Sequence, residues 1–156
     1  METNNRFDDS TNETTYFFSS IVERNTVKNL KQMKNQSYFI AGTDTGVGKT
    51  LITLSIMQSL QKTGLSVCGM KPVASGCDLV NGQLVSEDAA QIKKHGSQDL
   101  PLIAINPLAF KSPCSPNIAA EIEGKVMDMG LVVHAYNEIQ SLVDIVLVEG
   151  VGGWRS

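Results

Sequence analysis

The chain has 156 residues, 42% of them hydrophobic and 19% charged, and its formal net charge at pH 7 is −3. A chain of this length can bury one core, and its acidic balance argues against a general nucleic-acid surface, which requires a basic face. No apolar run approaches the roughly 20 residues that a membrane-spanning helix needs. The three cysteines form no Cys-x-x-Cys pair, so we expect a protein of a reducing compartment, the cytoplasm, without disulfides or a zinc site.

Residues 1–36 differ in composition from the rest of the chain. They are rich in Asn, Thr and Ser, with one short apolar patch at 16–18. This composition predicts a disordered segment. Met33 begins "MKNQSYFIAGT", a natural start for a domain that opens on a strand, so the segment is interpreted as a disordered or spurious extension. Residues 37–156 are expected to form the folded domain.

From residue 37 onward, apolar runs typical of buried strands alternate with helical patterns. The predicted strands are 38–42, 65–73 and 144–150. The predicted helices are 49–64, 86–96 and 129–143. Ser86 is expected to cap its helix, and Gly64 to end the first one. The proline-rich stretch 106–124 predicts a rigid loop that enters a short helix near Pro116. This alternation predicts an α/β fold with parallel strands and helical crossovers.

The predicted sheet is small. Only three strands precede the end of the chain, whereas a doubly wound sheet usually has five or more. We therefore expect the chain to be the N-terminal part of a longer domain, incomplete at its C-terminus. We also expect the strand at 144–150 to have an uncovered edge.

The stretch "AGTDTGVGKT" at residues 41–50 joins the first predicted strand to the first predicted helix. A phosphate-binding loop reads Gly-x-x-x-x-Gly-Lys-Ser/Thr; here Gly42 stands one position too early, but "TGVGKT" is intact. Backbone amides from Gly46 to Thr50 can surround phosphates at the helix N-terminus. Lys49 would reach the β and γ oxygens, and the Thr50 hydroxyl would bind Mg²⁺. The alternative is a glycine-rich turn with a chance Lys-Thr pair.

Further polar residues complete the candidate site, because open α/β sheets bind ligands at the carboxyl ends of their strands. Glu149 ends the run "IVLV" and is placed to bind Mg²⁺. Lys71 in "GMKPVASG" should face the same crevice and bind an anionic group, to which Ser75 could hydrogen-bond. Asp88 in "SEDAA" is a second metal candidate, although alone it would be a first-turn acid that suits the helix dipole. Taken singly, Glu149 and Lys71 would be ordinary solvated charges.

Five blocks of the sequence together resemble the dethiobiotin synthetase family. They are "GTDTGVGKT", "GMKPVASG", "SEDA", "NPLAFKSPCSPNIAAEIEG" and "VLVEGVGGW", in order and at fitting distances, between Tyr38 and Trp154. The pairing of "GTDT-x-VGKT" with "KPVASG" is specific, because other ATPases of this superfamily share the loop but not the second block. The resemblance implies a three-layer α/β fold like that of P-loop NTPases, with a mostly parallel sheet.

For the reaction, the resemblance implies an ATP- and Mg²⁺-dependent cyclo-ligase of biotin synthesis. Its substrates would be 7,8-diaminononanoate, CO2 and ATP. One amine takes up CO2 as a carbamate, which attacks the γ-phosphate and gives a carbamic-phosphoric anhydride. The second amine then closes the ureido ring of dethiobiotin, and ADP and phosphate are released. The resemblance also implies a homodimer.

For the site, the resemblance implies roles for individual residues. Lys71 would be the catalytic cation near the carbamate and the γ-phosphate, Lys49 would act with it, and Ser75 would contact the substrate. The metal ligands would be Thr50, Asp88 and Glu149. The nucleotide would be bound by Gly46, Val47, Gly48, Lys49, Thr50, Leu51, Asp88, Glu149, Gly150, Val151 and Gly152.

Two other functions stay open at this point. A partition or assembly ATPase of the same superfamily would use the loop as a switch, but such proteins carry Lys where Asp44 stands, and "KPVASG" would then be unexplained. An inactive fragment is the other alternative, because the family continues past Trp154 with residues for base recognition, dimerisation and the substrate's carboxylate tail. One departure lies inside the match: Asn117 follows "SP" where many relatives carry His.

Overall fold

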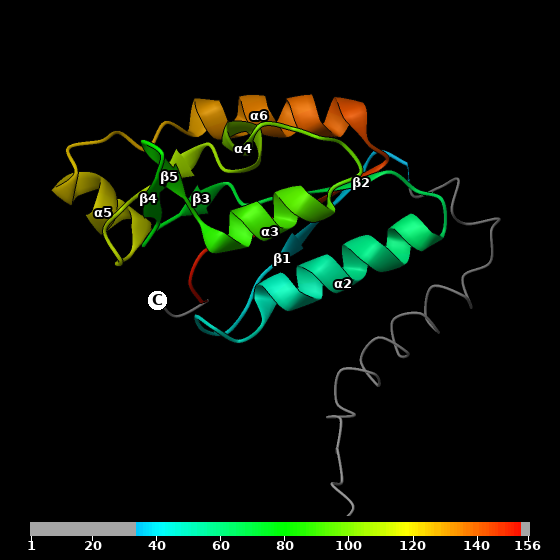
Figure 1. The fold of residues 1–156 in the computed structure, drawn as a ribbon, viewed down its shortest axis with the longest axis horizontal. Coiled ribbons are helices and arrows are strands. Elements are labelled where there is room, and N and C mark those ends of the chain that lie inside the picture. The colour runs from blue at the N-terminus through cyan, green and yellow to red at the C-terminus, as the bar shows by residue number, and fades with distance from the viewer. Residues whose placement is uncertain (1–33, 154–156) are drawn as a thin grey trace, which may run out of the picture.

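The computed structural model describes residues 34–153, and Figure 1 shows how they are arranged. Three parallel strands form the central sheet in the order β1 (Gln36–Ile40), β7 (Ile145–Glu149) and β2 (Val67–Met70). The strand that ends in Glu149 is therefore the middle strand of the sheet. The extension predicted at 1–36 lies outside the described residues except for 34–36, and Trp154 lies outside them too.

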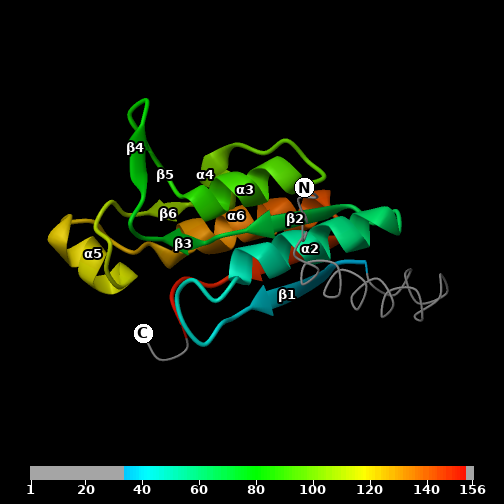
Figure 2. The ribbon, with the colours of Figure 1, turned by 60° about the horizontal axis from the view of Figure 1, so that its bottom comes forward.

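The helices cover both faces of this sheet. Their bounds are α2 (Lys49–Lys62), α3 (Glu87–His95), α4 (Leu102–Ile105), α5 (Pro116–Ile122) and α6 (Met129–Leu142). Figures 1 and 2 show α2 and α6 on opposite sides of the strands. Ile145 and Leu147 share a buried cluster with Met57 of α2, whereas Val146 shares one with Ile139 of α6. The middle strand is thus buried on both faces, which confirms the three-layer α/β prediction. None of these described helices has the length and apolar content needed to cross a membrane.

The predicted helices are confirmed to within two residues at each end. The capping chemistry explains this accuracy: the Ser86 hydroxyl accepts a hydrogen bond from the Ala89 amide, and Gly64 follows α2 with φ of 88°. The helix expected near Pro116 begins at that residue. The strands fit less closely, because β1 begins and ends two residues before its predicted range and β2 is shorter than 65–73.

Several short strands and one short helix were not predicted from the sequence. β4 (Asp78–Val80) and β5 (Gln83–Val85) form an antiparallel hairpin, and β3 (Val73–Ala74) pairs in parallel with β6 (Leu108–Ala109). The hairpin had a signal, since Asn81 and Gly82 both adopt positive φ at its turn and Asn-Gly favours such turns. The two-residue strands and the four-residue α4 are too short to produce a periodic pattern.

The prediction of an uncovered edge on the strand at 144–150 is wrong. β7 pairs on both sides, with β1 and with β2. Within residues 34–153 the open edge next to β7 belongs to β1, where the side chains of Tyr38 and Phe39 are 40% and 67% exposed. The crossover through α6 inserts the last strand between the first two, so that β7 has a neighbour on each side.

Asp144 joins the beginnings of β2 and β7. Its Oδ2 accepts hydrogen bonds from the Ser66 amide and hydroxyl at 2.9 and 2.8 Å, and its own amide donates to the Ser66 carbonyl at 3.0 Å. These bonds from Ser66, together with the Lys34 ammonium, lower the pKa of Asp144. The carboxylate form therefore stabilises the fold.

Asp144→Asn is expected to be less stable than the wild type at neutral pH, with a difference that shrinks in acid. A carboxyl whose pKa is lowered by folding stabilises the protein above its unfolded pKa, here near 3.8, and loses that contribution as the pH falls through the folded pKa. Urea unfolding at a series of pH values measures the difference. A gap between the two proteins that stays constant with pH would contradict the assignment.

A second prediction concerns Gly69, where two helices close on β2. A Cβ at this position would lie 2.4 Å from Ile92 Cγ2 and 3.0 Å from Met57 Sδ. Gly69→Ala is therefore expected to lower the free energy of unfolding by about 1–3 kcal/mol through overpacking. Gly96→Ala is the control, because Gly96 has φ of −68° and its Cβ would meet nothing closer than 3.4 Å. Equal losses of stability in the two variants would refute the packing argument.

Candidate active site

The loop between β1 and α2 turns at two glycines. Gly46 and Gly48 have φ of 74° and 91°, and Gly48 is the N-cap of α2. Glycine adopts these angles without strain, so the loop can present backbone amides at the helix N-terminus. Gly42 has a different role: a Cβ there would lie 2.8 Å from Val47 Cγ2 and 3.0 Å from Lys49 Cδ. The early glycine makes room for the stem of Lys49.

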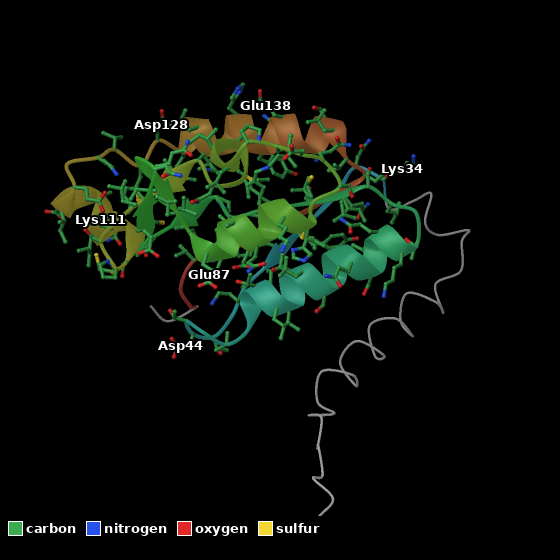
Figure 3. All side chains as sticks on the ribbon, viewed as in Figure 1. Lys34, Asp44, Glu87, Lys111, Asp128 and Glu138 are labelled. Carbon is green, nitrogen blue, oxygen red and sulfur yellow. The ribbon has the colours of Figure 1, made fainter. Side chains whose placement is uncertain are left out.

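Lys49 folds back over its own loop. Its Nζ donates to the Asp44 carbonyl at 2.7 Å, and Asp44 Oδ1 accepts a hydrogen bond from the Thr45 amide at 2.6 Å. Figure 3 shows Asp44 on this loop and Glu87 at the beginning of α3, at the same end of the molecule. α3 thereby brings Asp88, the neighbour of Glu87, into the cleft that Lys49 also lines.

Glu149 is the buried centre of the site. Its side chain is fully buried at the end of β7, where it accepts hydrogen bonds from one ammonium group and two hydroxyl groups. Oε1 accepts hydrogen bonds from Thr50 Oγ1 at 2.9 Å and from Lys71 Nζ at 2.7 Å, while Oε2 accepts one from Thr53 Oγ1 at 2.8 Å. A buried carboxylate is stable only when it is paired and hydrogen-bonded in this way. The site is therefore built into the core rather than added to the surface.

Asp88 is the second carboxylate that Lys71 binds. Lys71 Nζ lies 2.9 Å from Asp88 Oδ2, and the Asp88 side chain is 45% exposed. Burial by itself would raise the pKa of Asp88. Hydrogen bonds from Lys71 and Thr50 and the charges of Lys71 and Lys49 outweigh that effect, so its pKa is lowered. Asp88 is thus held as a carboxylate at the mouth of the site.

The backbone of Lys71 is held rigidly at the end of β2. Its amide donates to the Ile105 carbonyl at 2.9 Å, and its carbonyl accepts a hydrogen bond from Asn106 Nδ2 at 2.7 Å. Asn106 is buried and also donates to the Leu108 carbonyl at 3.2 Å. Asn106 escaped the sequence analysis, and its position just before Pro107 in the proline-rich stretch was the available signal. It clamps the strand end that carries the lysine.

Lys71 opens onto a cleft of about 1060 Å³. Parts of the loop at 45–50, the segment 74–76, the segment 113–117 and residues 151–153 line it. Glu123 fixes the approach to the 113–117 segment: it binds Lys125 Nζ at 2.7 Å and the Ser112 amide at 2.9 Å, and these bonds lower its pKa to about 2. The volume of the cleft lies just above the roughly 300–1,000 Å³ typical of small-molecule sites.

The structure brings most of the predicted site residues together. Those that line the cleft are Gly46, Gly48, Lys49, Thr50, Lys71, Ser75, Asp88, Val151 and Gly152. Glu149 and the Gly150 carbonyl lie behind Lys71, which donates to both. Val47 and Leu51 are 49% and 62% exposed and are not among the residues that line the cleft. The binding roles of all these residues stay predictions.

Two of the glycines after Glu149 are required by close packing of the backbone. A Cβ at Gly150 would lie 2.9 Å from Phe39 Cζ, and one at Gly153 would lie 2.5 Å from Asp44 Cα. These glycines let the segment after β7 pack against β1 and the phosphate-binding loop. Gly152 and Gly153 also line the cleft.

Thr53 is a site residue that the sequence analysis missed. It is fully buried in α2, and its hydroxyl is within hydrogen-bond distance of Glu149 Oε2 and of the Lys49 carbonyl. Thr50 and Thr53 are one helical turn apart, so both side chains face the end of β7. A polar residue in the buried stripe of an amphipathic helix was the signal.

Thr53→Val is expected to destabilise the protein by about 1–3 kcal/mol, because it leaves Glu149 Oε2 buried without this partner. Thr53→Ser keeps the hydroxyl and serves as the control. We expect Thr53→Ser to be less stable than the wild type only by the cost of one buried methyl group, about 1 kcal/mol, because its hydroxyl still binds Glu149. Urea unfolding measures both variants. If the valine variant were as stable as the wild type, Thr53 would not support Glu149.

A divalent metal fits the oxygen atoms gathered here. Thr50 Oγ1 binds Glu149 Oε1, and Glu149 and Asp88 together surround a cation, the Lys71 ammonium. Among residues 34–153 there is no cluster of three or more His, Cys, Asp and Glu side chains that could enclose a metal by itself. Two carboxylates and a hydroxyl, completed by phosphate oxygens and water, are the ligands that Mg²⁺ favours.

Comparison with known proteins agrees with this geometry. The profile of a family described as AAA domain matches residues 36–156. The ATP-dependent dethiobiotin synthetase BioD of Aromatoleum aromaticum is 40% identical over 120 residues, which are 77% of this chain and 53% of that protein. The enzyme of the same name from Alteromonas mediterranea is 41% identical over 125 residues, covering 77% and 54%.

A third relative is ATP-dependent dethiobiotin synthetase BioD 1 of Salmonella typhi, 38% identical over 117 residues, which are 75% of this chain and 51% of that protein. The chain spans about half the length of the curated relatives it matches. The resemblance inferred from the sequence blocks is confirmed. The chain belongs to the AAA domain family, with a P-loop NTPase-like α/β fold, and is related to the dethiobiotin synthetases.

Proposed function

We propose that this site binds ATP and Mg²⁺ and serves the reaction of a dethiobiotin synthetase. The reaction is the carboxylation and ring closure of 7,8-diaminononanoate with CO2, which forms the ureido ring of dethiobiotin and releases ADP and phosphate. The relatives that carry this name support the choice of reaction. By the same resemblance we propose a cytoplasmic homodimer for the whole enzyme.

One observation carries the proposal: a buried lysine faces the same cleft as the phosphate-binding loop. Lys71 lines the cleft together with Lys49 and Thr50, and its side chain is only 5% exposed. A loop that only binds and releases a nucleotide does not need a second desolvated cation at the end of the next strand. A phosphoryl transfer to an anionic nucleophile does, because negative charge accumulates between nucleophile and γ-phosphate.

Each residue has a defined task in this reaction. The amides at 46–50 would hold the phosphates, and Lys49 would exchange its bond to the Asp44 carbonyl for a phosphate oxygen. Thr50, Asp88 and Glu149 would hold Mg²⁺, which when bound neutralises charge on the phosphates. Lys71 would place its ammonium beside the carbamate oxygen that attacks. Ser75, also on the cleft surface, would hydrogen-bond the substrate.

The central test supplies the purified chain with 7,8-diaminononanoate, bicarbonate, Mg²⁺ and ATP. The proposal expects phosphate release that depends on the diamine, together with formation of the cyclic urea. Lys71→Met should lower turnover by about 10²–10³-fold, the usual cost of removing one preorganised charge-stabilising group. Lys93→Met is the control, because Lys93 pairs with Asp99 on the surface.

The outcomes separate the alternatives. A rate of ATP hydrolysis that does not depend on the diamine would favour a switch ATPase. ATP binding without turnover would show that this chain holds the nucleotide site but not the complete enzyme. Full activity of Lys71→Met would remove Lys71 from the mechanism.

A further inference from the structure

The ammonium of Lys71 sits among the oxygen atoms that the proposed function assigns to the metal. Its Nζ lies 2.7 Å from Glu149 Oε1, 2.9 Å from Asp88 Oδ2 and 3.3 Å from the Gly150 carbonyl. Thr50 Oγ1 donates to the same Glu149 oxygen at 2.9 Å. A single ammonium group of the protein therefore already pairs with both carboxylates that would bind a divalent cation.

We propose that Lys71 is a built-in counter-ion, so that its ammonium and a divalent cation compete for Asp88 and Glu149, and entry of the metal releases the ammonium into the cleft. This inference rests on the proposed function and adds that metal binding regulates the position of Lys71. The Lys71 ammonium reaches the cleft, where it would assist the nucleophile, only when the metal has replaced it on the carboxylates. Metal binding therefore precedes the movement of Lys71 toward the nucleophile.

Burial explains why the exchange must be one cation for another. The Glu149 side chain is 0% exposed and that of Lys71 is 5% exposed. If the ammonium left without replacement, Glu149 would be a buried charge without a counter-ion, which is strongly unfavourable. If both cations bound the same carboxylate oxygens, they would repel each other at close range. The two occupied states are therefore mutually exclusive.

The surrounding contacts allow the ammonium to move while the rest stays fixed. The Lys71 backbone is held by Ile105 and Asn106, so only the side-chain torsions need to change. Glu149 Oε2 stays bound to Thr53, which leaves Oε1 as the oxygen that exchanges cations. The cleft that Lys71 lines is the open side toward which the flexible lysine stem can swing.

Titration with Mn²⁺ alone, without nucleotide and followed by electron paramagnetic resonance, tests the competition. Lys71→Met should bind Mn²⁺ at least about tenfold more tightly than the wild type, because a close buried charge pair no longer has to be broken. Lys49→Met removes the same charge from the cleft without freeing a carboxylate, since Lys49 donates to a backbone carbonyl. We expect its Mn²⁺ affinity to change by less than about threefold.

Equal Mn²⁺ affinity in the wild type and Lys71→Met would overturn the proposal, as would equal gains in the two lysine variants. A folded Lys71→Met that binds no Mn²⁺ would overturn it as well. If that variant does not fold, acetylation of the wild type followed by mass spectrometry decides. Lys71 should react faster when saturating Mn²⁺ is present, with Lys93 as the internal reference, and an unchanged Lys71 rate would reject the exchange.

These measurements contain no diamine, CO2 or ATP, so their failure is distinct from failure of the proposed function. A chain that makes no dethiobiotin can still show cation exchange at Lys71. If the chain were active and its Mn²⁺ affinity did not depend on Lys71, the proposed function would stand and the cation exchange would be rejected.

Discussion

The ion pair between Lys71 and Glu149 is the interaction on which the site depends. Glu149 is fully buried at the end of the middle strand, and a carboxylate in that position needs a cation and hydrogen-bond donors around it. Lys71 supplies the charge, and Thr50 and Thr53 supply two hydroxyls. The first turn of α2, the end of β2 and the end of β7 are thereby drawn to one point.

The arrangement combines a rigid frame with one adjustable part. Asn106 clamps the strand end beneath Lys71, and the segment after Glu149 packs on β1 and the loop through Gly150 and Gly153. Against this frame, the lysine side chain is long and can adopt more than one rotamer. Under the proposed function, backbone positions would set where a phosphate and a metal bind, while the Lys71 side chain would respond to their arrival.

Sequence patterns predicted the parts of this site that depend on local chemistry. The "TGVGKT" loop, the Ser86 cap and the acid at the end of an apolar strand each had a recognisable signal, and the structure places Lys71, Asp88 and Glu149 together. Strand order was not predictable in the same way, because it depends on how crossovers wrap rather than on any local pattern. The uncovered edge was consequently assigned to the wrong strand. Thr53 was missed because its function lies in a contact with a residue 96 positions away.

A crystal structure of the chain with Mg²⁺ and a non-hydrolysable ATP analogue would show whether Lys71 leaves Glu149 when the metal binds. We expect the phosphates to lie on the amides at 46–50 and the metal to bind Thr50, Asp88 and Glu149. We also expect Lys71 Nζ to have moved beyond about 4 Å, the limit of an ion pair, from Glu149 Oε1. Phosphates bound elsewhere, or Lys71 still paired with Glu149 beside a bound metal, would contradict these expectations.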